Sequence, residues 1–203
     1  MTNKAVLFDL DGVLVDACDW HYEALNRALK QVANYEISRE DHMSTYNGLP
    51  TKRKLKSLAD LAIIREADIE KISDLKQDLT VGVIEDFCSE SVSKIAMMKT
   101  IKAAGYKIGC VTNSIRRTAG LMLLKTGIMD FFDVVITNEQ CANNKPHPEP
   151  YITALVQLNA LPHDSIIVED SPKGLEAARL TGCRVLEVKN ATEVTKDLFK
   201  DKL

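Results

Sequence analysis

The sequence predicts an α/β protein in which a mostly parallel β-sheet is covered by helices on both faces and carries an all-helical insert. From about residue 90 onward, strand-like apolar segments alternate with amphipathic segments, which is the pattern of a parallel sheet. Residues 4–8 form one more apolar strand near the start of the sequence. Between these parts, residues 18–87 show helical periodicity and no convincing strand.

The insert is expected to contain several helices. The first has Asp19 as its expected N-cap residue, and Ser38 is expected to cap the next one. A loop with Gly and Pro over residues 46–51 separates these helices from two later helical segments. We therefore expect two domains: an α/β core of residues 1–16 and 88–203, and a helical domain of residues 17–87.

The α/β part has a regular element order. Its expected strands are residues 106–111, 133–136, 164–168 and 184–188. Its expected helices are residues 92–104, 116–126, 148–158 and 172–181. Gly105, Gly127 and Gly182 stand where three of these helices should end.

Composition excludes several classes of protein. The 203 residues are 45% hydrophobic and 27% charged, with a net charge of −3, so no basic field attracts nucleic acid or an anionic membrane. No apolar run approaches the roughly 20 residues that span a bilayer, and no export signal is recognisable. We expect a cytoplasmic protein without nucleic-acid or membrane partners, a monomer or weak homodimer, whose five scattered cysteines are reduced thiols.

The first strand ends in two carboxylates, Asp9 and Asp11, followed by Gly12. Residues i and i+2 of a strand point to the same side, so two negative charges meet in one small volume. Like charges at this distance raise one pKa unless a cation lies between them. The pair therefore indicates a metal site, and the alternative is an ordinary strand that runs into an acidic turn.

Two later strands also end in polar residues. Residues 112–114 are Thr-Asn-Ser and residues 169–171 are Glu-Asp-Ser. Parallel sheets bind ligands at the carboxyl ends of their strands. The three polar clusters are therefore expected at one rim of the sheet.

Four motifs in order carry a family resemblance: FDLDG at residues 8–12, VTNS at 111–114, KPHP at 145–148 and VEDSP at 168–172. The chain resembles the haloacid dehalogenase superfamily, in the branch with a helical cap after the first motif, near phosphoglycolate phosphatase and β-phosphoglucomutase. The resemblance implies a Rossmann-like core with an inserted cap domain.

The resemblance implies a role for each catalytic motif residue. Asp9 would attack phosphorus to form an aspartyl-phosphate, and Asp11 would protonate the leaving oxygen and later activate water. Thr112 would hold a phosphoryl oxygen, and Lys145 would neutralise the nucleophile and the phosphate. Lysine in a loop is otherwise usually a solvated charge.

The same resemblance implies further phosphate and metal ligands. The N–H groups of Asn113 and Ser114 would assist in phosphate binding. The alternative for this Thr-Asn-Ser segment is an N-cap of the next helix, which is compatible with phosphate binding. Mg²⁺ would be held by Asp170, Asp9 and the backbone carbonyl of Asp11. Glu169 would bind this metal directly or through water, or would lie outside its ligand set.

The helical domain would act as a lid that selects the substrate. The candidate substrate-reading residues are His21, Asn47, Lys52 and Arg53. A partly buried histidine on a helix face and solvated surface charges are the alternatives for these side chains. A lid of this size suits a small phosphorylated metabolite.

Three functions remain open at this point. The first is a Mg²⁺-dependent phosphatase that hydrolyses a small phosphomonoester through an aspartyl-phosphate. A phosphosugar mutase would use the same core residues, and a non-catalytic phosphometabolite-binding protein would have no need of them. Carbon–halogen cleavage is disfavoured because a halide needs no proton from Asp11.

Overall fold

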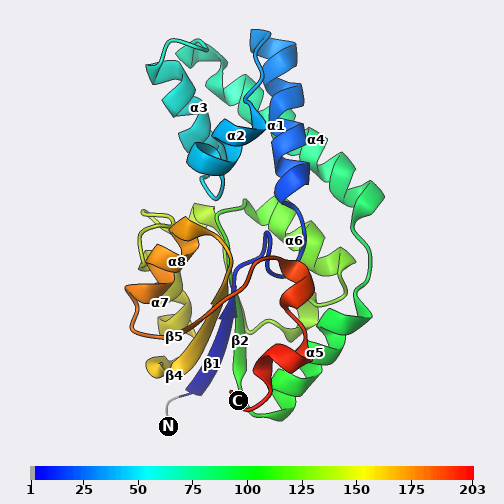
Figure 1. Ribbon diagram of the computed structural model, residues 1–203, viewed down its shortest axis with the longest axis vertical. Coiled ribbons are helices and arrows are strands. Elements are labelled where there is room, and N and C mark those ends of the chain that lie inside the picture. Colours follow the sequence, from blue (N-terminus) through cyan, green and yellow to red (C-terminus); the bar gives the residue numbers. More distant parts are fainter. Residues whose placement is uncertain (1–2) are drawn as a thin grey trace. The chain divides into compact units, whose positions relative to one another are not determined.

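The computed structural model describes residues 3–203, which form two compact units. One unit comprises the residues up to Asp16 together with Cys88–Leu203, and the other is Ala17–Phe87. The first unit contains the β-sheet and the second contains helices (Figure 1).

The sheet has five strands in the order β3-β2-β1-β4-β5, and every neighbouring pair is parallel. The strands are β1 (Asn3–Phe8), β2 (Lys107–Val111), β3 (Val134–Ile136), β4 (Ala160–Glu169) and β5 (Arg184–Glu187). The first strand is central, and its residues from Ala5 to Phe8 are completely buried, as a strand covered on both faces requires. The predicted α/β fold is confirmed, together with the helical region after β1.

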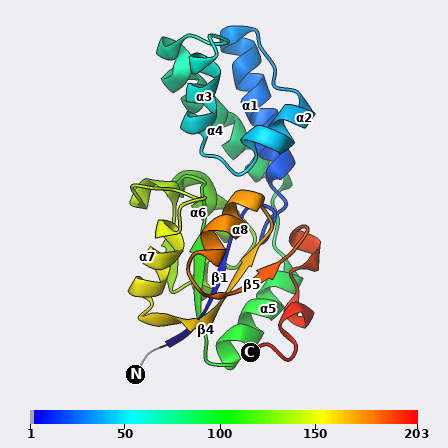
Figure 2. The ribbon, with the colours of Figure 1, turned by 60° about the vertical axis from the view of Figure 1, so that its left-hand side comes forward.

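Helices cover both faces of this sheet (Figures 1 and 2). They are α5 (Val92–Ala103) and α6 (Arg116–Lys125) on one face, and α7 (Glu149–Gln157) and α8 (Pro172–Arg179) on the other. The core beneath α7 joins Leu7 of β1 to Tyr151 and Leu155 of the helix. Apolar burial thus fixes the central strand, and with it the polar residues that follow.

Strand β4 is longer than the sequence indicated, because it begins at Ala160 and ends at Glu169. Its first residues alternate between buried and exposed positions and include Pro162 and His163. Such a segment lacks the apolar run that marks a buried strand. Pairing of Ala160 with Asn3 of β1 decides its conformation, which is a contact between distant parts of the chain.

The second unit is built from helices, and none of residues 17–87 lies in a strand. Its helices are α1 (Cys18–Ala33), α2 (Arg39–Asp41), α3 (Thr51–Asp60) and α4 (Ile69–Phe87), with a π-helical turn at His42–Tyr46. Its own apolar core includes Leu25, Leu29, Leu55 and Ile72. Among residues 3–203, no helix is both long and apolar enough to cross a membrane.

The prediction that Asp19 caps α1 was wrong. The N-cap residue is Ala17, which has no side-chain acceptor, and Asp19 lies within the first turn. Its carboxylate accepts a hydrogen bond from the Arg39 guanidinium at 2.6 Å. Ser38 does cap the next helix, because its hydroxyl accepts the N–H of Asp41.

The buried imidazole of His42 should make the stability of the helical unit depend on pH. Burial, and then the positive charge of Lys54, lowers its pKa to about 4 from the ordinary 6.5. Between these values the folded chain binds fewer protons than the unfolded chain. The free energy of unfolding should therefore fall as the pH drops from 6.5 towards 4, by up to about 3 kcal/mol.

Urea unfolding of the wild type and of His42→Phe over this pH range measures the effect. The phenylalanine keeps a ring against Tyr22, whose centroid lies 4.8 Å from that of His42. The variant should lose less stability on acidification. Parallel losses in the two proteins would contradict the assignment.

Candidate active site

Polar residues of four loops, those after β1, β2, β3 and β4, meet at the carboxyl edge of the sheet. Asp9 follows β1, and its N–H donates to the carbonyl of Val168 on β4 at 3.0 Å. Thr112 follows β2, and its N–H donates to Ile136 of β3 at 2.9 Å. The ladder hydrogen bonds of a parallel sheet therefore continue into the site and fix the backbone of both residues.

The Lys145 ammonium lies at the centre of the site and is buried, with 3% of the residue exposed. It donates to Asp9 Oδ1 at 2.8 Å and to Glu169 Oε2 at 2.7 Å. Its Nζ also lies over the ring of Tyr151, 4.6 Å from the centroid. Burial opposes the charge, but the negative charges of Asp9 and Glu169 outweigh this effect and raise the pKa of Lys145.

Glu169 is fully buried and surrounded by donors. Its Oε2 accepts the Tyr151 hydroxyl at 2.6 Å besides Lys145, and its Oε1 accepts the Ser171 hydroxyl and the N–H groups of Asp170 and Ser171. Burial opposes ionisation, yet the Lys145 charge and these hydrogen bonds lower the pKa of Glu169. Tyr151 was not predicted, since nothing in the sequence distinguishes it from other aromatic core residues.

Two glycines make room for the acidic side chains. A Cβ built on Gly174 of α8 would lie 2.0 Å from the Glu169 carboxyl carbon. A Cβ on Gly12, whose φ is +89°, would lie 2.2 Å from Asp170 Oδ2. The turn after β1 can therefore approach Asp170 only because residue 12 has no side chain.

Asp11 points towards the loop after β2. Its Oδ2 accepts the Ser114 hydroxyl at 2.7 Å and the Thr112 hydroxyl at 3.4 Å. The Thr112 hydroxyl oxygen in turn accepts the N–H of Ser114 at 2.9 Å. The structure therefore brings together Asp11, Thr112 and Ser114, and it adds a contact of the Ser114 side chain that the sequence did not indicate.

The Asn113 side chain holds the loop that carries Lys145. Its amide nitrogen donates to the Lys145 carbonyl, and its oxygen accepts the Lys145 N–H, both at 3.2 Å. The Lys145–Pro146 peptide bond is cis. The sequence pointed to the backbone of Asn113, whereas its side chain forms this reciprocal pair.

Asp9, Glu169 and Asp170 form a buried acidic group that could hold a metal ion. One carboxylate oxygen from each lies within 4.8 Å of the others. The buried Asp170 Oδ1 accepts no hydrogen bond from residues 3–203, which is consistent with a metal-ligand role for this oxygen. Burial and the Glu169 charge raise the pKa of Asp9 well above its usual value and that of Asp170 to about 7, so a cation here would relieve like-charge repulsion.

The predicted substrate-reading residues belong to the helical unit. The His21 Nδ1 atom on α1 lies 3.0 Å from the Nζ of Lys76, a buried lysine of α4 that the sequence did not single out. Lys52 pairs with Glu70 at the surface, with a distance of 2.8 Å between Nζ and Oε2. Arg53 is exposed, and Asn47 is half-buried, with its N–H donating to the carbonyl of His42.

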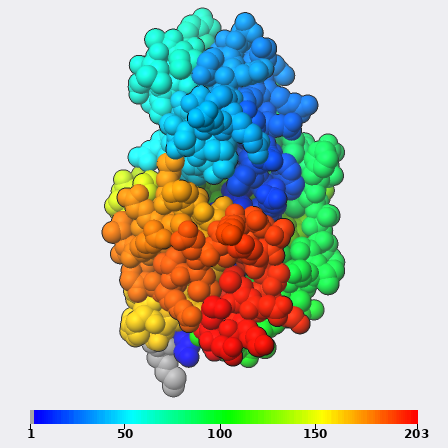
Figure 3. All heavy atoms as spheres, viewed as in Figure 1, coloured from blue at the N-terminus to red at the C-terminus, as the bar shows by residue number. Residues whose placement is uncertain are grey.

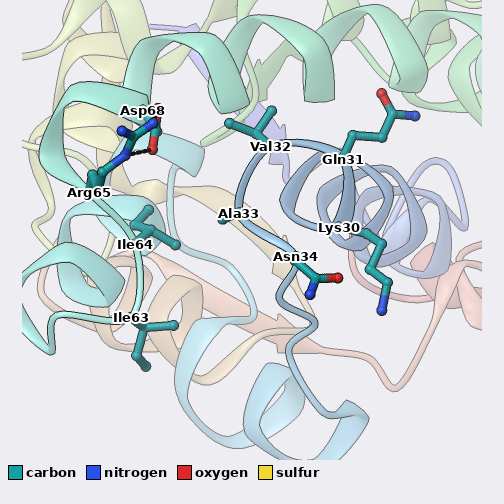
Figure 4. A pocket seen from close by; sticks show the side chains of 9 residues that line it. All are labelled: Lys30, Gln31, Val32, Ala33, Asn34, Ile63, Ile64, Arg65 and Asp68. Atoms are coloured by element: carbon teal, nitrogen blue, oxygen red, sulfur yellow. Dashed lines mark hydrogen bonds and ion pairs between the residues drawn. The ribbon is translucent and has the colours of Figure 1, made fainter.

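A surface cavity of about 400 Å³ also lies in the helical unit. It is lined by residues 30–34, residues 63–65 and Asp68 (Figure 4). Arg65 and Asp68 close one side with a two-pronged ion pair at 2.7 and 2.9 Å. None of the four predicted substrate-reading residues contributes to this cavity.

The sequence matches the protein family described as "Haloacid dehalogenase-like hydrolase" over residues 6–188. This span includes nearly the whole sheet and every residue of the site described above. The chain therefore belongs to the haloacid dehalogenase-like hydrolases, and the predicted family is confirmed.

Individual relatives differ in their named substrates. The chain is 28% identical to the "Phosphorylated carbohydrates phosphatase" of Thermotoga maritima, over 88% of this chain and 82% of the relative. It is 27% identical to the "Pyrophosphatase PpaX" of Bacillus pumilus, over 98% and 89% of the two chains. The crystal structure of β-phosphoglucomutase from Clostridium difficile has the same fold, with a TM-score of 0.84 at 23% identity over 98% of this chain and 96% of that one.

Substitution of Gly174 by alanine should disturb the site through Glu169. Alanine normally favours a helix over glycine by about 1 kcal/mol, but here its methyl group would overlap the Glu169 carboxylate. We expect a lower midpoint of urea unfolding. The matched control is Gly120→Ala in α6, where the nearest atom to an added Cβ is 3.8 Å away. Equal midpoints for the two variants would show that the close approach of Gly174 to the Glu169 carboxylate does not affect stability.

Proposed function

We propose that the chain is a Mg²⁺-dependent phosphatase that hydrolyses a small phosphomonoester through an aspartyl-phosphate on Asp9. The observation that carries this proposal is a pair of differently held carboxylates. The buried Asp9 carboxylate is paired with Lys145, and the Asp11 carboxylate, two residues further along the chain, accepts the Ser114 hydroxyl. One carboxylate is thereby oriented for attack and the other for proton transfer. Family membership supports hydrolysis as the reaction class.

The reaction would proceed in two steps. An Asp9 oxygen attacks phosphorus while the bond from phosphorus to the leaving oxygen breaks, and Asp11 gives that oxygen a proton. Asp11 then takes a proton from water, whose oxygen attacks phosphorus and displaces Asp9. The Lys145 ammonium offsets the negative charge that nucleophile and phosphoryl group bring together.

Mg²⁺ fits the acidic group at this edge, since it prefers oxygen ligands. The Asp9 and Asp170 carboxylates and the Asp11 carbonyl would hold it. The oxygens of Glu169 already accept five hydrogen bonds from the protein, which favours a place outside the ligand set. When bound, the metal supplies positive charge that attracts the phosphate and stabilises its transition state.

Phosphate binding is assigned to the loop after β2. The Thr112 hydroxyl and the N–H groups of Asn113 and Ser114 would be the neutral donors, and a bound phosphoryl group would replace Asp11 as the acceptor for Thr112 and Thr112 as the acceptor for the Ser114 N–H. Specificity is assigned to the helical unit, where His21 with Lys76 is a stronger candidate than Lys52, which is committed to Glu70. The name of the Thermotoga maritima relative supports a phosphorylated carbohydrate as the substrate class.

Replacement of Asp9 by Asn should abolish turnover and leave the fold intact, because an amide cannot form the phospho-enzyme. Loss of at least about a thousandfold in kcat is expected, measured as release of inorganic phosphate. The control is Asp130→Asn, which removes an exposed carboxylate elsewhere in the same unit. Substantial turnover by Asp9→Asn would rule out its role as the nucleophile.

Removal of divalent cations by EDTA should stop turnover, and Mg²⁺ should restore it. Binding can be followed without turnover, because a ligand that binds only the folded chain raises its thermal midpoint. Mg²⁺ should raise the midpoint of the wild type and not that of Asp170→Asn. A shift of equal size in both proteins would remove Asp170 from the ligand set.

A panel of sugar, polyol, glycolate and nucleotide monophosphates, together with inorganic pyrophosphate, separates the remaining reactions. Phosphate release from an ester supports the phosphatase. Isomerisation of a sugar phosphate that requires a bisphosphate activator, without phosphate release, would indicate the mutase instead. Tight binding of a phosphate ester without either reaction would indicate the binding protein.

A further inference from the structure

Lys94 of α5 is a buried lysine outside the site described above. Only 6% of the residue is exposed, and its ammonium donates to three backbone carbonyls: Val13 at 3.1 Å, Ala191 at 2.7 Å and Val194 at 2.7 Å. These carbonyls come from two segments that are far apart in the sequence. Burial of a charged group costs free energy, and no carboxylate of residues 3–203 is paired with this ammonium. The three carbonyl contacts must therefore offset the cost.

The Val13 carbonyl belongs to the turn that carries Asp11. Within this turn the Leu10 carbonyl accepts the N–H groups of Val13, Leu14 and Val15, and the Gly12 N–H donates to Val15. One end of the turn is packed against Asp170 through Gly12. Lys94 holds the turn through the carbonyl that follows Gly12.

The other two carbonyls belong to the segment after β5. This segment starts where the Val188 N–H donates to Glu169 and continues to Phe199, whose ring packs edge-on against Phe8 of β1 at 5.8 Å between centroids. Its red atoms lie beside the green atoms of the α5 region in Figure 3, and η6 (Lys196–Phe199) contacts α5. The ammonium is therefore a link between this segment and the Asp11 turn.

No uncharged apolar side chain could replace this link. Carbonyl oxygens only accept hydrogen bonds, so a buried group between three of them must donate several, and an ammonium has three donors. Burial lowers the pKa of Lys94 to about 8, which still leaves the ammonium mainly protonated at neutral pH. Loss of the donors would leave buried carbonyls unsatisfied and free the turn to shift.

We propose that Lys94 is a positioning residue, which sets the place of the Asp11 carboxylate by tying the Leu10–Val15 turn to the segment that contains Ala191 and Val194. The consequence for catalysis rests on the proposed role of Asp11 as the proton donor. A displaced Asp11 should impair reactions whose leaving group needs a proton. Esters with a leaving group that departs as a stable anion should be affected less.

The test compares Lys94→Met with Lys99→Met, which removes an exposed lysine from the same helix. For Lys94→Met, kcat/KM with an alkyl phosphate should fall about tenfold more than kcat/KM with p-nitrophenyl phosphate. The Lys99→Met control should leave this ratio unchanged. Lys94→Gln, which keeps N–H donors without the charge, should show the same pattern to a smaller degree. An equal loss with both substrates, or a ratio equal to that of the control, overturns the proposal.

Amide hydrogen exchange tests the link without any substrate. Lys94→Met should increase exchange in both the 10–15 turn and residues 188–199, whereas Phe199→Ala should loosen chiefly the second segment. Unchanged exchange in the turn overturns the proposal. If the wild type hydrolyses no phosphate ester, the proposed function fails, while the exchange result still decides whether Lys94 connects the two segments.

Discussion

The site depends on one buried cation between two buried carboxylates. Lys145 lies within hydrogen-bond distance of Asp9 and Glu169, and none of the three groups could be buried in charged form alone. Their mutual compensation allows an acidic residue to follow the central strand of the sheet, whose last four residues are buried. It also leaves the group with a net negative charge, which favours a divalent cation next to it.

Four further residues of the site support this arrangement. Tyr151 satisfies the Glu169 oxygen that also faces Lys145, and Asn113 fixes the backbone from which Lys145 extends. Gly174 and Gly12 leave the volume that the two acids after β4 occupy. Small residues and neutral donors thus hold the charged groups in one arrangement.

The sequence predicted the fold, the order of the motifs and the rim at which they meet, because apolar periodicity and polar strand ends are local signals. It did not predict contacts that depend on tertiary structure. Tyr151 and Lys94 look like an ordinary aromatic residue and an ordinary helix lysine, and only their burial distinguishes them. Asp19 shows the reverse error, since a residue with good capping propensity pairs with Arg39 instead. The start of β4 was missed because a single pairing, that of Ala160 with Asn3 of β1 ahead of an irregularity in the ladder, extends the strand there, and hydrophobicity does not mark it.

The spacing of the central ion pair also matters for the biosynthesis of the chain. Asp9 and Lys145 are 136 residues apart, and the whole helical unit is translated between them. Strand β1 and Asp9 therefore leave the ribosome long before β4 is made and before Lys145 can neutralise the Asp9 carboxylate. The helical unit has an apolar core of its own and can fold during this interval, whereas the sheet must wait for its later strands. A nascent chain consequently exposes an apolar strand with an uncompensated carboxylate at its end, and the Lys145 ammonium that compensates this charge is added only in the last third of synthesis.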